Sequence, residues 1–343
     1  MPLGIAVIGL GRWGPNHLRN FSAHRDCIVL AAADPSTASR ERVAQSYRTV
    51  QLYADYREVL ARSDIDAVVV SSPTATHAEI VRAALQAGKH VLCEKPLTNS
   101  SADAWPLVAM ARERKRVLMV GHVFLYNAGI EYLVKAARRQ EAGSPFYMDA
   151  VRTNLGPFRS DVNAAWDLAS HDIYIFNYVL GERPTWVSAV GASFLRKPVE
   201  DIVFLTLQYP SGVLGHIHVS WLDPKKLRMI TLVGENKMIT WDEFGVPGPI
   251  MIYDRSVVKD PVYTTYGEFQ LLTREGDVVL PRIQLHEPLV AQTKAFVERC
   301  RAGADGEDDR GTARQGAEVV DVLEAAAASL RDNNRRVEVK YGG

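Results

Sequence analysis

The stretch that decides the fold is residues 4–14, which read GIAVIGLGRWG. It opens with a short apolar run, and then Gly9, Gly11 and Gly14 match G-x-G-x-x-G before a helix-like stretch that begins at Pro15. A dinucleotide-binding turn needs glycines there for a sharp turn, for bare backbone against a pyrophosphate and for close packing of the helix. A glycine-rich surface turn would fit the letters alone, but a strand before and a helix after favour dinucleotide binding.

An acidic residue ends the second apolar segment, CIVLAAADP at residues 27–35. Asp34 follows Gly9 by 25 residues. A carboxylate at this place can hold the ribose 2′-hydroxyl of NAD and repel the 2′-phosphate of NADP. The sequence therefore predicts NAD as the cofactor, while Ser36 and Arg40 close by keep NADP as the alternative.

Two further segments carry polar residues where predicted strands end, SSPTATH at 71–77 and CEKP at 93–96. In a doubly wound sheet these ends face the cofactor crevice. A lysine buried beside a carboxylate is costly to keep without a use, so Glu94 and Lys95 are expected at the nicotinamide. Alternatively, Pro73 and Pro96 only end the strands and begin loops, and His77 has a structural role. The expected cofactor contacts beyond the glycines and Asp34 are Arg12, Trp13, Ser72, Pro73, Thr74, His77, Glu94 and Lys95, and Trp13 could instead plug a domain interface.

Residues 1–121 alternate short, continuous apolar runs with helical stretches. Such runs are typical of parallel strands buried on both faces of a sheet. We therefore predict an α/β, doubly wound Rossmann domain over residues 1–121. Its expected strands are 4–8, 27–35, 66–73, 89–96 and 116–122, with helices at 15–24, 36–47, 76–88 and about 101–115.

The pattern changes after Gly121, where longer segments alternate apolar and polar residues. Alternation of this kind indicates antiparallel strands with one covered face. Helices are expected at about 286–302 and 312–332. Residues 122–343 are therefore predicted to form a second, α+β domain with a large open, mainly antiparallel sheet, which would bind the substrate.

Composition narrows the function classes. Forty basic and forty acidic residues give no net charge, which argues against broad capture of nucleic acid or an anionic membrane surface. No run of about 18 apolar residues indicates a membrane span. The N-terminus lacks a basic leader and a cleavage site, and three distant cysteines, Cys27, Cys93 and Cys300, do not form a disulfide scaffold. We expect a cytoplasmic protein, and no residue is assigned to a metal.

Residues 166–172 read WDLASHD and precede a strongly apolar stretch, so they look like the start of a buried helix. Two aspartates and a histidine are costly to bury. They are either caps and paired core groups or catalytic groups. A spacing of four would put Asp167 and His171 on one face of a helix.

Three segments together resemble the Gfo/Idh/MocA oxidoreductases: GLGRWG, SSPTATHAEIVRAALQAGKHVLCEKPL and DLASH. The resemblance runs over nearly the whole chain from Ile5. It implies a Rossmann domain, a second domain whose open sheet often forms the interface of a homodimer or homotetramer, and hydride transfer between NAD(P) and a sugar, cyclitol or related polyol. It also implies that Lys95 is the active-site lysine and that Asp167 and His171 are the D-x-x-x-H pair.

The chain departs from the family pattern at two places. Ala169 stands where many members have glycine, and GHVFLYN at 121–127 lacks the arginine of the version common in cyclitol enzymes. The second departure argues against inositol. Residues 152–172 and SWLDPKKLR at 220–228 resemble members that oxidise the 3-hydroxyl of nucleotide-linked amino sugars, or that reduce 3-keto sugars in deoxysugar pathways.

A mechanism follows from these residues. Hydride leaves a carbinol carbon as its hydroxyl loses a proton, so a base must reach that oxygen. His171 is expected as the base, with Asp167 orienting it, because an imidazole exchanges protons near neutral pH. Lys95 would donate to the oxygen and stabilise developing negative charge, although it could equally be the base itself.

Other polar residues are candidates for the substrate. Asn154, Arg159 and Asn163 could bind sugar hydroxyls, an acyl amide or a phosphate, and Tyr126 and Asn127 could bridge cofactor and sugar. Lys225, Lys226 and Arg228 could meet a diphosphate, and Trp166 and Trp221 could stack on a ring, with plain structural roles as alternatives. A glycosidase that oxidises C3 transiently, and a ligand-binding regulator without chemistry, are the alternatives of other classes.

Overall fold

The protein is described by a computed structural model that covers residues 2–159, 161–257, 273–303 and 309–342. Its contacts divide the chain into two compact units. The first unit comprises Met1–Tyr126, His286–Asp321 and Tyr341–Gly343. The second comprises Asn127–Leu285 and Val322–Lys340.

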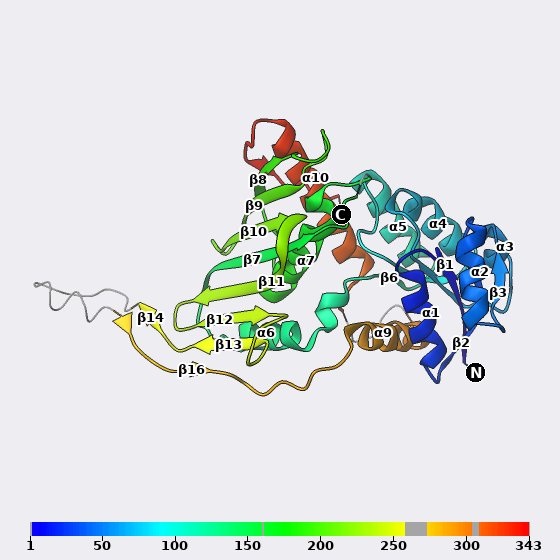
Figure 1. Ribbon diagram of the computed structural model, residues 1–343, viewed down its shortest axis with the longest axis horizontal. Coiled ribbons are helices and arrows are strands. Elements are labelled where there is room, and N and C mark those ends of the chain that lie inside the picture. The colour runs from blue at the N-terminus through cyan, green and yellow to red at the C-terminus, as the bar shows by residue number, and fades with distance from the viewer. Residues whose placement is uncertain (1, 160, 258–272, 304–308, 343) are drawn as a thin grey trace, which may run out of the picture. The chain divides into compact units, whose positions relative to one another are not determined.

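The first unit holds a six-stranded parallel sheet with the order β3-β2-β1-β4-β5-β6 (Figure 1). The chain order of the strands reverses between β1 and β4, which makes this the switch point of a doubly wound sheet. The strands are β1 (Leu3–Ile8), β2 (Cys27–Ala33), β3 (Gln51–Tyr53), β4 (Ala67–Val70), β5 (His90–Cys93) and β6 (Leu118–Val120). The helices are α1 (Gly14–Ala23), α2 (Thr37–Ser46), α3 (Tyr56–Leu60), α4 (Thr74–Gln86) and α5 (Ser101–Glu113).

The predicted Rossmann fold is confirmed, and one strand was missed. β3 has only three residues, none of them buried, so it lacks the apolar run that marks the other strands. Strands β1, β4, β5 and β6 are almost wholly buried, as expected for a sheet covered on both faces, and β2 is mostly buried.

Late parts of the chain group with the first unit, which the predicted boundary at residue 121 did not anticipate. The 3₁₀-helix η1 (Val123–Tyr126), α9 (Pro288–Ala302) and α10 (Ala313–Arg331) as far as Asp321 belong there. Phe296 meets Phe21 of α1 edge to face, with ring centroids 6.0 Å apart. These late helices cover apolar surface that the first 121 residues alone would leave exposed.

The second unit is built on a nine-stranded sheet with the order β16-β13-β12-β11-β7-β10-β9-β8-β17. Among the described ladders of this sheet, only the pair of β7 and β10 is parallel, and the other pairs are antiparallel. The sheet is therefore mixed, and the prediction that it is mainly antiparallel is confirmed. Its strands are β7 (Pro145–Leu155), β8 (Trp186–Ala192), β9 (Ile202–Gln208), β10 (Leu214–Ser220), β11 (Leu222–Gly234), β12 (Met238–Asp242), β13 (Ile250–Tyr253), β16 (Val278–Val279) and β17 (Val337–Glu338). A separate ladder joins β14 (Ser256–Val257) and β15 (Thr273–Arg274).

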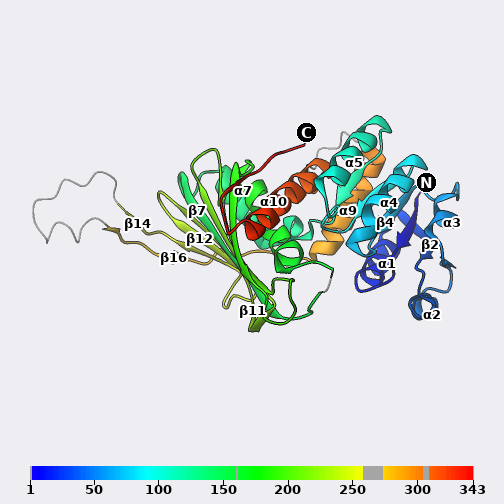
Figure 2. The same ribbon diagram turned by 90° about the horizontal axis from the view of Figure 1, so that it is seen from above.

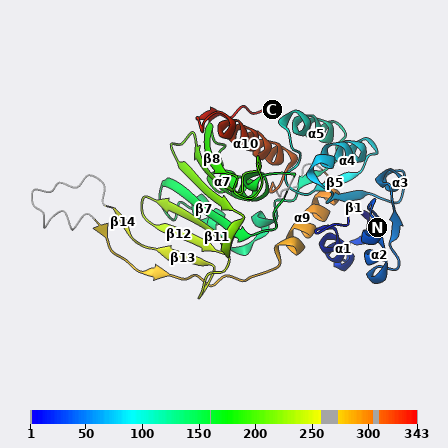
Figure 3. The same cartoon turned by 45° about the horizontal axis from the view of Figure 1, so that its top comes forward.

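Helices of this unit pack on one face of the large sheet. They are α6 (Ala128–Arg138), the π-helical turn η2 (Ala165–Ala169), α7 (Ser170–Leu180) and the later part of α10. Figures 2 and 3 show α7 on one side of the strands. On the other face, Phe204, Leu214 and Met229 are exposed, whereas their strand neighbours Val203 and Ile230 are buried. Alternation thus places apolar side chains on an open face.

Within the described residues, no helix combines the length and apolarity that crossing a membrane requires. The same residues contain no cluster of three or more His, Cys, Asp or Glu side chains that could hold a metal ion. Cys27, Cys93 and Cys300 are buried free thiols.

Candidate functional site

Each glycine of the turn between β1 and α1 is required for a different reason. Gly9 has φ of +95°, and a Cβ on it would lie 2.5 Å from the backbone nitrogen of Ser72. A Cβ on Gly14 would overlap the carbonyl oxygen of Gly9. Gly11 faces open space, which leaves its backbone accessible to a ligand. These are the three properties that a pyrophosphate-binding turn needs.

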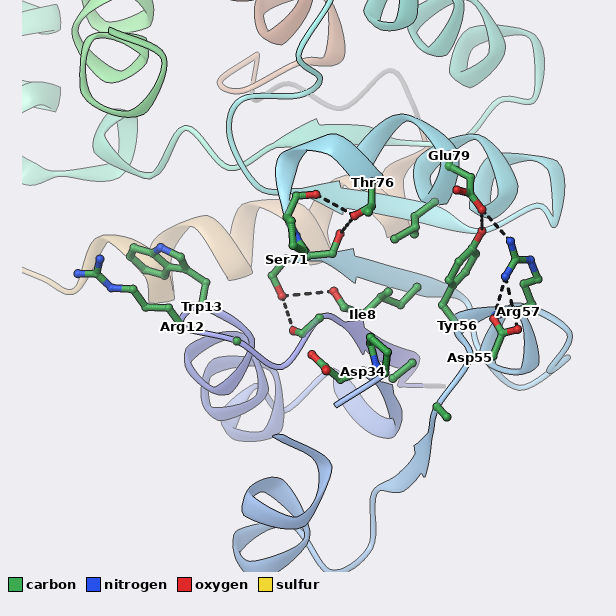
Figure 4. A pocket seen from close by; sticks show the side chains of 18 residues that line it. Ile8, Arg12, Trp13, Asp34, Asp55, Tyr56, Arg57, Ser71, Thr76 and Glu79 are labelled. Atoms are coloured by element: carbon green, nitrogen blue, oxygen red, sulfur yellow. Dashed lines mark hydrogen bonds and ion pairs between the residues drawn. The ribbon is translucent and has the colours of Figure 1, made fainter. Parts of the chain in front are cut away.

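A pocket of about 740 Å³ opens at the carboxyl ends of β1, β2 and β4. Figure 4 shows Arg12 and Trp13 at one end, with Trp13 40% exposed, and the side chain of Asp34 near the middle. The pocket is lined by Ile8, Gly9, Gly11, Arg12, Trp13, Ala33, Asp34, Pro35, Ala54, Asp55, Tyr56, Arg57, Ser71, Ser72, Pro73, Thr76, Glu79 and Ile80. Its volume is within the range of small-molecule and cofactor sites.

The carboxylate of Asp34 is held in place by backbone donors. The Leu10 N–H donates to Oδ2 at 2.7 Å, and the Ser36 N–H donates to Oδ1 at 2.8 Å. The nearby guanidinium of Arg40 donates to the carbonyl oxygen of Asp34 at 2.6 Å and to the hydroxyl of Thr37 at 3.0 Å. Arg40 is therefore engaged locally and does not line the pocket.

The predicted contacts at the start of α4 separate into two groups. Ser72 and Pro73 line the pocket, and the Ser72 hydroxyl lies 2.7 Å from that of Thr76. Thr74 and His77 are buried and do not line it.

His77 is 1% exposed and connects two loops. Its ring nitrogens lie 2.9 Å from the Ser72 carbonyl oxygen and 3.0 Å from the Pro96 carbonyl oxygen. Burial lowers its pKa below the ordinary value despite these acceptors. The structural alternative considered for His77 thus fits its surroundings, and it supports the pocket wall through Ser72.

Sequence reasoning missed the far end of the pocket, where Asp55, Tyr56, Arg57 and Glu79 gather (Figure 4). The Tyr56 hydroxyl donates to Glu79 at 2.6 Å, and Arg57 donates to the same oxygen at 2.7 Å. Burial and then the hydrogen bond to Glu79 raise the pKa of Tyr56 to about 12. These residues follow β3, the strand that was missed, so recognising β3 would have pointed to them.

Glu94 and Lys95 follow β5 outside this pocket, and a buried histidine from α1 joins them. The Nε2 atom of His17 lies 2.8 Å from Oε1 of Glu94, and the Lys95 N–H donates to Oε2 at 3.3 Å. Burial alone would raise the pKa of Glu94, but the hydrogen bond from His17 and the nearby charges of His17 and Lys95 hold it below its ordinary value. Burial and then the charge of Lys95 lower the pKa of His122 to about 3.

The predicted substrate contact at Tyr126 is not supported by its position. Its side chain is 0% exposed, its hydroxyl donates to the carbonyl oxygen of Arg310 at 3.3 Å, and the Arg310 guanidinium lies 4.1 Å from its ring centroid. A fully covered ring has no surface for a ligand. Asn127 caps α6, since its side-chain oxygen accepts the Gly129 N–H at 2.9 Å.

In the second unit, WDLASHD forms the π-helical turn η2 and the start of α7, not a regular α-helix throughout. The carboxylate of Asp167 accepts from Arg159 Nη1 and from Trp221 Nε1, each at 3.3 Å. The Nδ1 atom of His171 lies 3.0 Å from the hydroxyl oxygen of Tyr174. The predicted spacing on a regular helix therefore does not apply, and π-helical turns are frequent at functional sites.

Asp172 has the paired-core role that was considered for it. Its carboxylate accepts from Nε and Nη2 of Arg152, at distances down to 2.6 Å, and both side chains are almost fully buried. Removing one partner of a buried ion pair strongly destabilises the folded protein, because the other charge is left buried without compensation. The ion pair ties α7 to β7.

The other predicted substrate residues have protein partners of their own. Arg159 pairs with Asp161 through two nitrogens at 3.0 and 2.6 Å, besides its contact with Asp167. Asn163 donates to Glu200 at 2.8 Å and accepts the Trp166 N–H at 3.1 Å. The side chain of Asn154 donates to the carbonyl oxygen of Gly156.

Residues 223–228 lie within β11, where Lys225 and Lys226 are exposed. Arg228 pairs with Glu243 at 2.6 Å, and the Lys226 ammonium lies 5.3 Å from the Phe244 ring centroid. These contacts fit the structural alternative of a charged, solvated segment.

Comparisons with known proteins agree with this fold. Residues 3–122 match the model of the GFO/IDH/MocA oxidoreductase family with an NAD-binding Rossmann fold, and residues 134–240 match the family's C-terminal domain. The chain is 33% identical to the UDP-N-acetylglucosamine 3-dehydrogenase of Acidithiobacillus ferrooxidans, over 69% of this chain and 72% of the relative. It is 28% identical to the myo-inositol 2-dehydrogenase of Thermotoga maritima, over 62% of this chain and 67% of the relative.

A solved structure extends the likeness over the whole chain. GenD2 from gentamicin A biosynthesis, in complex with NAD, matches with a TM-score of 0.82 and 25% identity, over 99% of this chain and 97% of GenD2.

Proposed function

Because the chain belongs to the Gfo/Idh/MocA oxidoreductase family, we propose that it transfers a hydride between NAD and a sugar carbinol, the 3-hydroxyl of a nucleotide-linked amino sugar. The observation that carries the proposal is the pocket in which Gly11 leaves bare backbone, in a turn shaped by Gly9 and Gly14, beside a fixed Asp34 carboxylate. We assign cofactor binding to the first unit, and substrate binding and oligomerisation to the second.

The residues at Asp34 support NAD over NADP. Both carboxylate oxygens are oriented by backbone donors, so the group is fixed where a ribose 2′-hydroxyl can donate to it. A 2′-phosphate would meet this negative charge, and Arg40 is turned to backbone carbonyl oxygens. Gly9, Gly11 and Gly14 would hold the pyrophosphate at the N-terminus of α1, where the helix dipole favours an anion.

Three residues carry the chemistry in this proposal. When bound, NAD supplies the hydride acceptor. His171 takes the proton of the substrate hydroxyl, and the Tyr174 hydroxyl beside its Nδ1 orients the ring. Asp167, held by Arg159 and Trp221, contacts the substrate or orients His171. Lys95 donates to the reacting oxygen and stabilises its developing charge.

The relatives support the substrate class. The relative that acts on UDP-N-acetylglucosamine shares more identity with this chain than the myo-inositol dehydrogenase does. Asn154 and Arg159, which lie at the end of β7 and in the loop that follows, are proposed to reach the distal part of the substrate. We further propose a homodimer or homotetramer formed through the open sheet face, working in the cytoplasm, where buried free thiols persist.

A substrate screen tests the proposal. NADH formation is measured with NAD and a panel of free sugars, sugar phosphates, UDP- and TDP-linked sugars, and cyclitols. The proposal expects turnover of a nucleotide-linked amino sugar to its 3-keto product, and TDP- or UDP-linked 3-keto sugars should be reduced in reverse. Turnover of cyclitols alone would contradict the substrate class. Hydrolysis of an aryl glycoside without added NAD would replace the dehydrogenase by the glycosidase alternative.

A further inference from the structure

One buried pair beside the proposed catalytic lysine has no role in the mechanism above. His17 is 0% exposed on α1, and its Nε2 lies 2.8 Å from Oε1 of Glu94, the residue that precedes Lys95. The other ring nitrogen, Nδ1, is buried and has no hydrogen-bond partner in the part of the chain that the structure describes. The ring thus meets one polar group, the carboxylate of Glu94.

This geometry gives the carboxylate of Glu94 a defined donor. The Nε2 atom of His17 donates to Oε1 at 2.8 Å. The hydrogen bond from His17 and the nearby charges of His17 and Lys95 lower the pKa of Glu94 against the effect of burial, so the carboxylate is ionised.

The carboxylate of Glu94 lies close enough to Lys95 for the charge of the lysine to lower its pKa, and it also contacts the lysine backbone. The second carboxylate oxygen, Oε2, accepts the Lys95 N–H at 3.3 Å. It also faces the backbone of Gly121 after β6, where a Cβ would lie 3.1 Å from it. The glycine lets the strand pass close to the carboxylate.

Three titratable groups near the pair have pKa values shifted towards their uncharged forms. Burial lowers the pKa of His77 on α4 and raises the pKa of Cys93 on β5 well above its ordinary value. The pKa of His122, next to Lys95, is about 3 through burial and the lysine's charge. Among the groups named here, Glu94 carries a negative charge that interacts with the positive charge of Lys95.

We propose that His17 is a positioning residue which fixes the ionised carboxylate of Glu94, and that this charge keeps Lys95 as an ammonium group. Lys95 then donates to the reacting oxygen, and the proton of the substrate hydroxyl goes to His171. The assignment of these two roles rests on the proposed function, whereas the charge state of Lys95 does not.

The charge state can be measured without a substrate. Competitive acetylation with acetic anhydride across pH 7–11, followed by digestion and mass spectrometry, gives the titration midpoint of Lys95. Exposed Lys115 is the internal reference in each sample. Glu94→Gln should lower the Lys95 midpoint by about one pH unit or more, since the two groups interact electrostatically and a nearby opposite charge shifts a group by about 1–3 units.

Variants of His17 separate positioning from packing. His17→Leu removes the donor, so the carboxylate takes up a proton or turns away, and the Lys95 midpoint should fall by a smaller amount. His17→Gln keeps an N–H donor, so its Lys95 midpoint should lie close to that of the wild type. His90→Leu is the matched control, because His90 is half-buried at the start of β5 and accepts the Val117 N–H. It should leave the midpoint unchanged.

Two results would overturn the proposal. One is a titration midpoint of Lys95 that is the same in folded Glu94→Gln as in the wild type. If His17→Leu does not fold, this measurement on Glu94→Gln still tests the proposal. The other is a shift of equal size in His17→Gln and His17→Leu. Loss of the proposed dehydrogenase activity in every assay would leave these titrations readable, so the two proposals fail separately.

Discussion

The cofactor pocket of the first unit and the WDLASHD segment of the second encode their function differently. In the pocket, the proposed cofactor binding rests on backbone: Gly9, Gly11 and Gly14 are each explained by a steric distance or an open space. In WDLASHD, side chains depend on partners distant in the sequence, such as Trp221 for Asp167 and Arg152 for Asp172. Backbone-encoded features can be read from a short motif, whereas side-chain networks require the fold.

The largest expected effect is on the chemistry of the second unit. His171→Asn removes the proposed base, and kcat should fall by about a hundredfold or more. NAD affinity, measured by titration of protein fluorescence, should stay within about twofold of the wild type, because the pocket of the first unit is complete without it. Full turnover in this variant would contradict the role of His171 as the base.

The next effect breaks the pocket alone. Gly11→Ala places a methyl group in open space, so the fold is not disturbed, but it projects where the pyrophosphate would approach. Overpacking of about 1–3 kcal/mol corresponds to a loss of NAD affinity of about fivefold to somewhat over a hundredfold. Gly248→Ala is the control, since it adds a methyl group in open space in the second unit. Equal NAD affinity in both variants would contradict the assignment of the turn.

A smaller effect tests how the pocket chooses its cofactor. Asp34→Asn keeps the acceptor oxygen but removes the charge, so the preference for NAD over NADP should narrow by about tenfold. The measurement is the ratio of the two dissociation constants. Arg40→Ala should leave this ratio nearly unchanged, because Arg40 donates to backbone carbonyl oxygens. If Arg40→Ala changed the ratio of dissociation constants more than Asp34→Asn does, Arg40 and not Asp34 would determine the cofactor preference.

The smallest effect concerns the open sheet face. The hydrogen bond that half-exposed His216 donates to Asp149, 2.8 Å away, raises the pKa of this histidine. Its stabilisation is complete below the ordinary pKa of about 6.5 and is lost as the pH rises through the higher folded value. At pH 5.5 the free energy of unfolding of the wild type should be higher than that of His216→Gln by less than about 1 kcal/mol. At pH 8.5 the difference should be smaller. Denaturant titrations at both pH values check this, and an unchanged difference would refute it.

The sequence predicted the fold further than it predicted the side-chain environments. Continuous apolar runs predicted β1, β2, β4, β5 and β6, because burial on both faces leaves a local trace. The short, unburied β3 leaves no such trace, and with it the residues after it, Tyr56 and Arg57, were missed.

Sequence reasoning also misplaced residues whose environment depends on distant contacts. Tyr126 was expected at the substrate, yet η1 is covered by segments 160 or more residues away, including His286 and Arg310. His17 was not singled out, because nothing near it in the sequence indicates Glu94 as its partner. Such pairings follow from the order of strands and helices in space, not from local pattern.

The most direct test of the account follows the hydride itself. UDP-N-acetylglucosamine deuterated at C3 is incubated with the protein and NAD, and the nicotinamide product is examined by mass spectrometry. The account predicts one deuterium in each NADH formed, and slower turnover than with the undeuterated sugar. NADH without deuterium, or NADH formed from myo-inositol and not from this sugar, would contradict it.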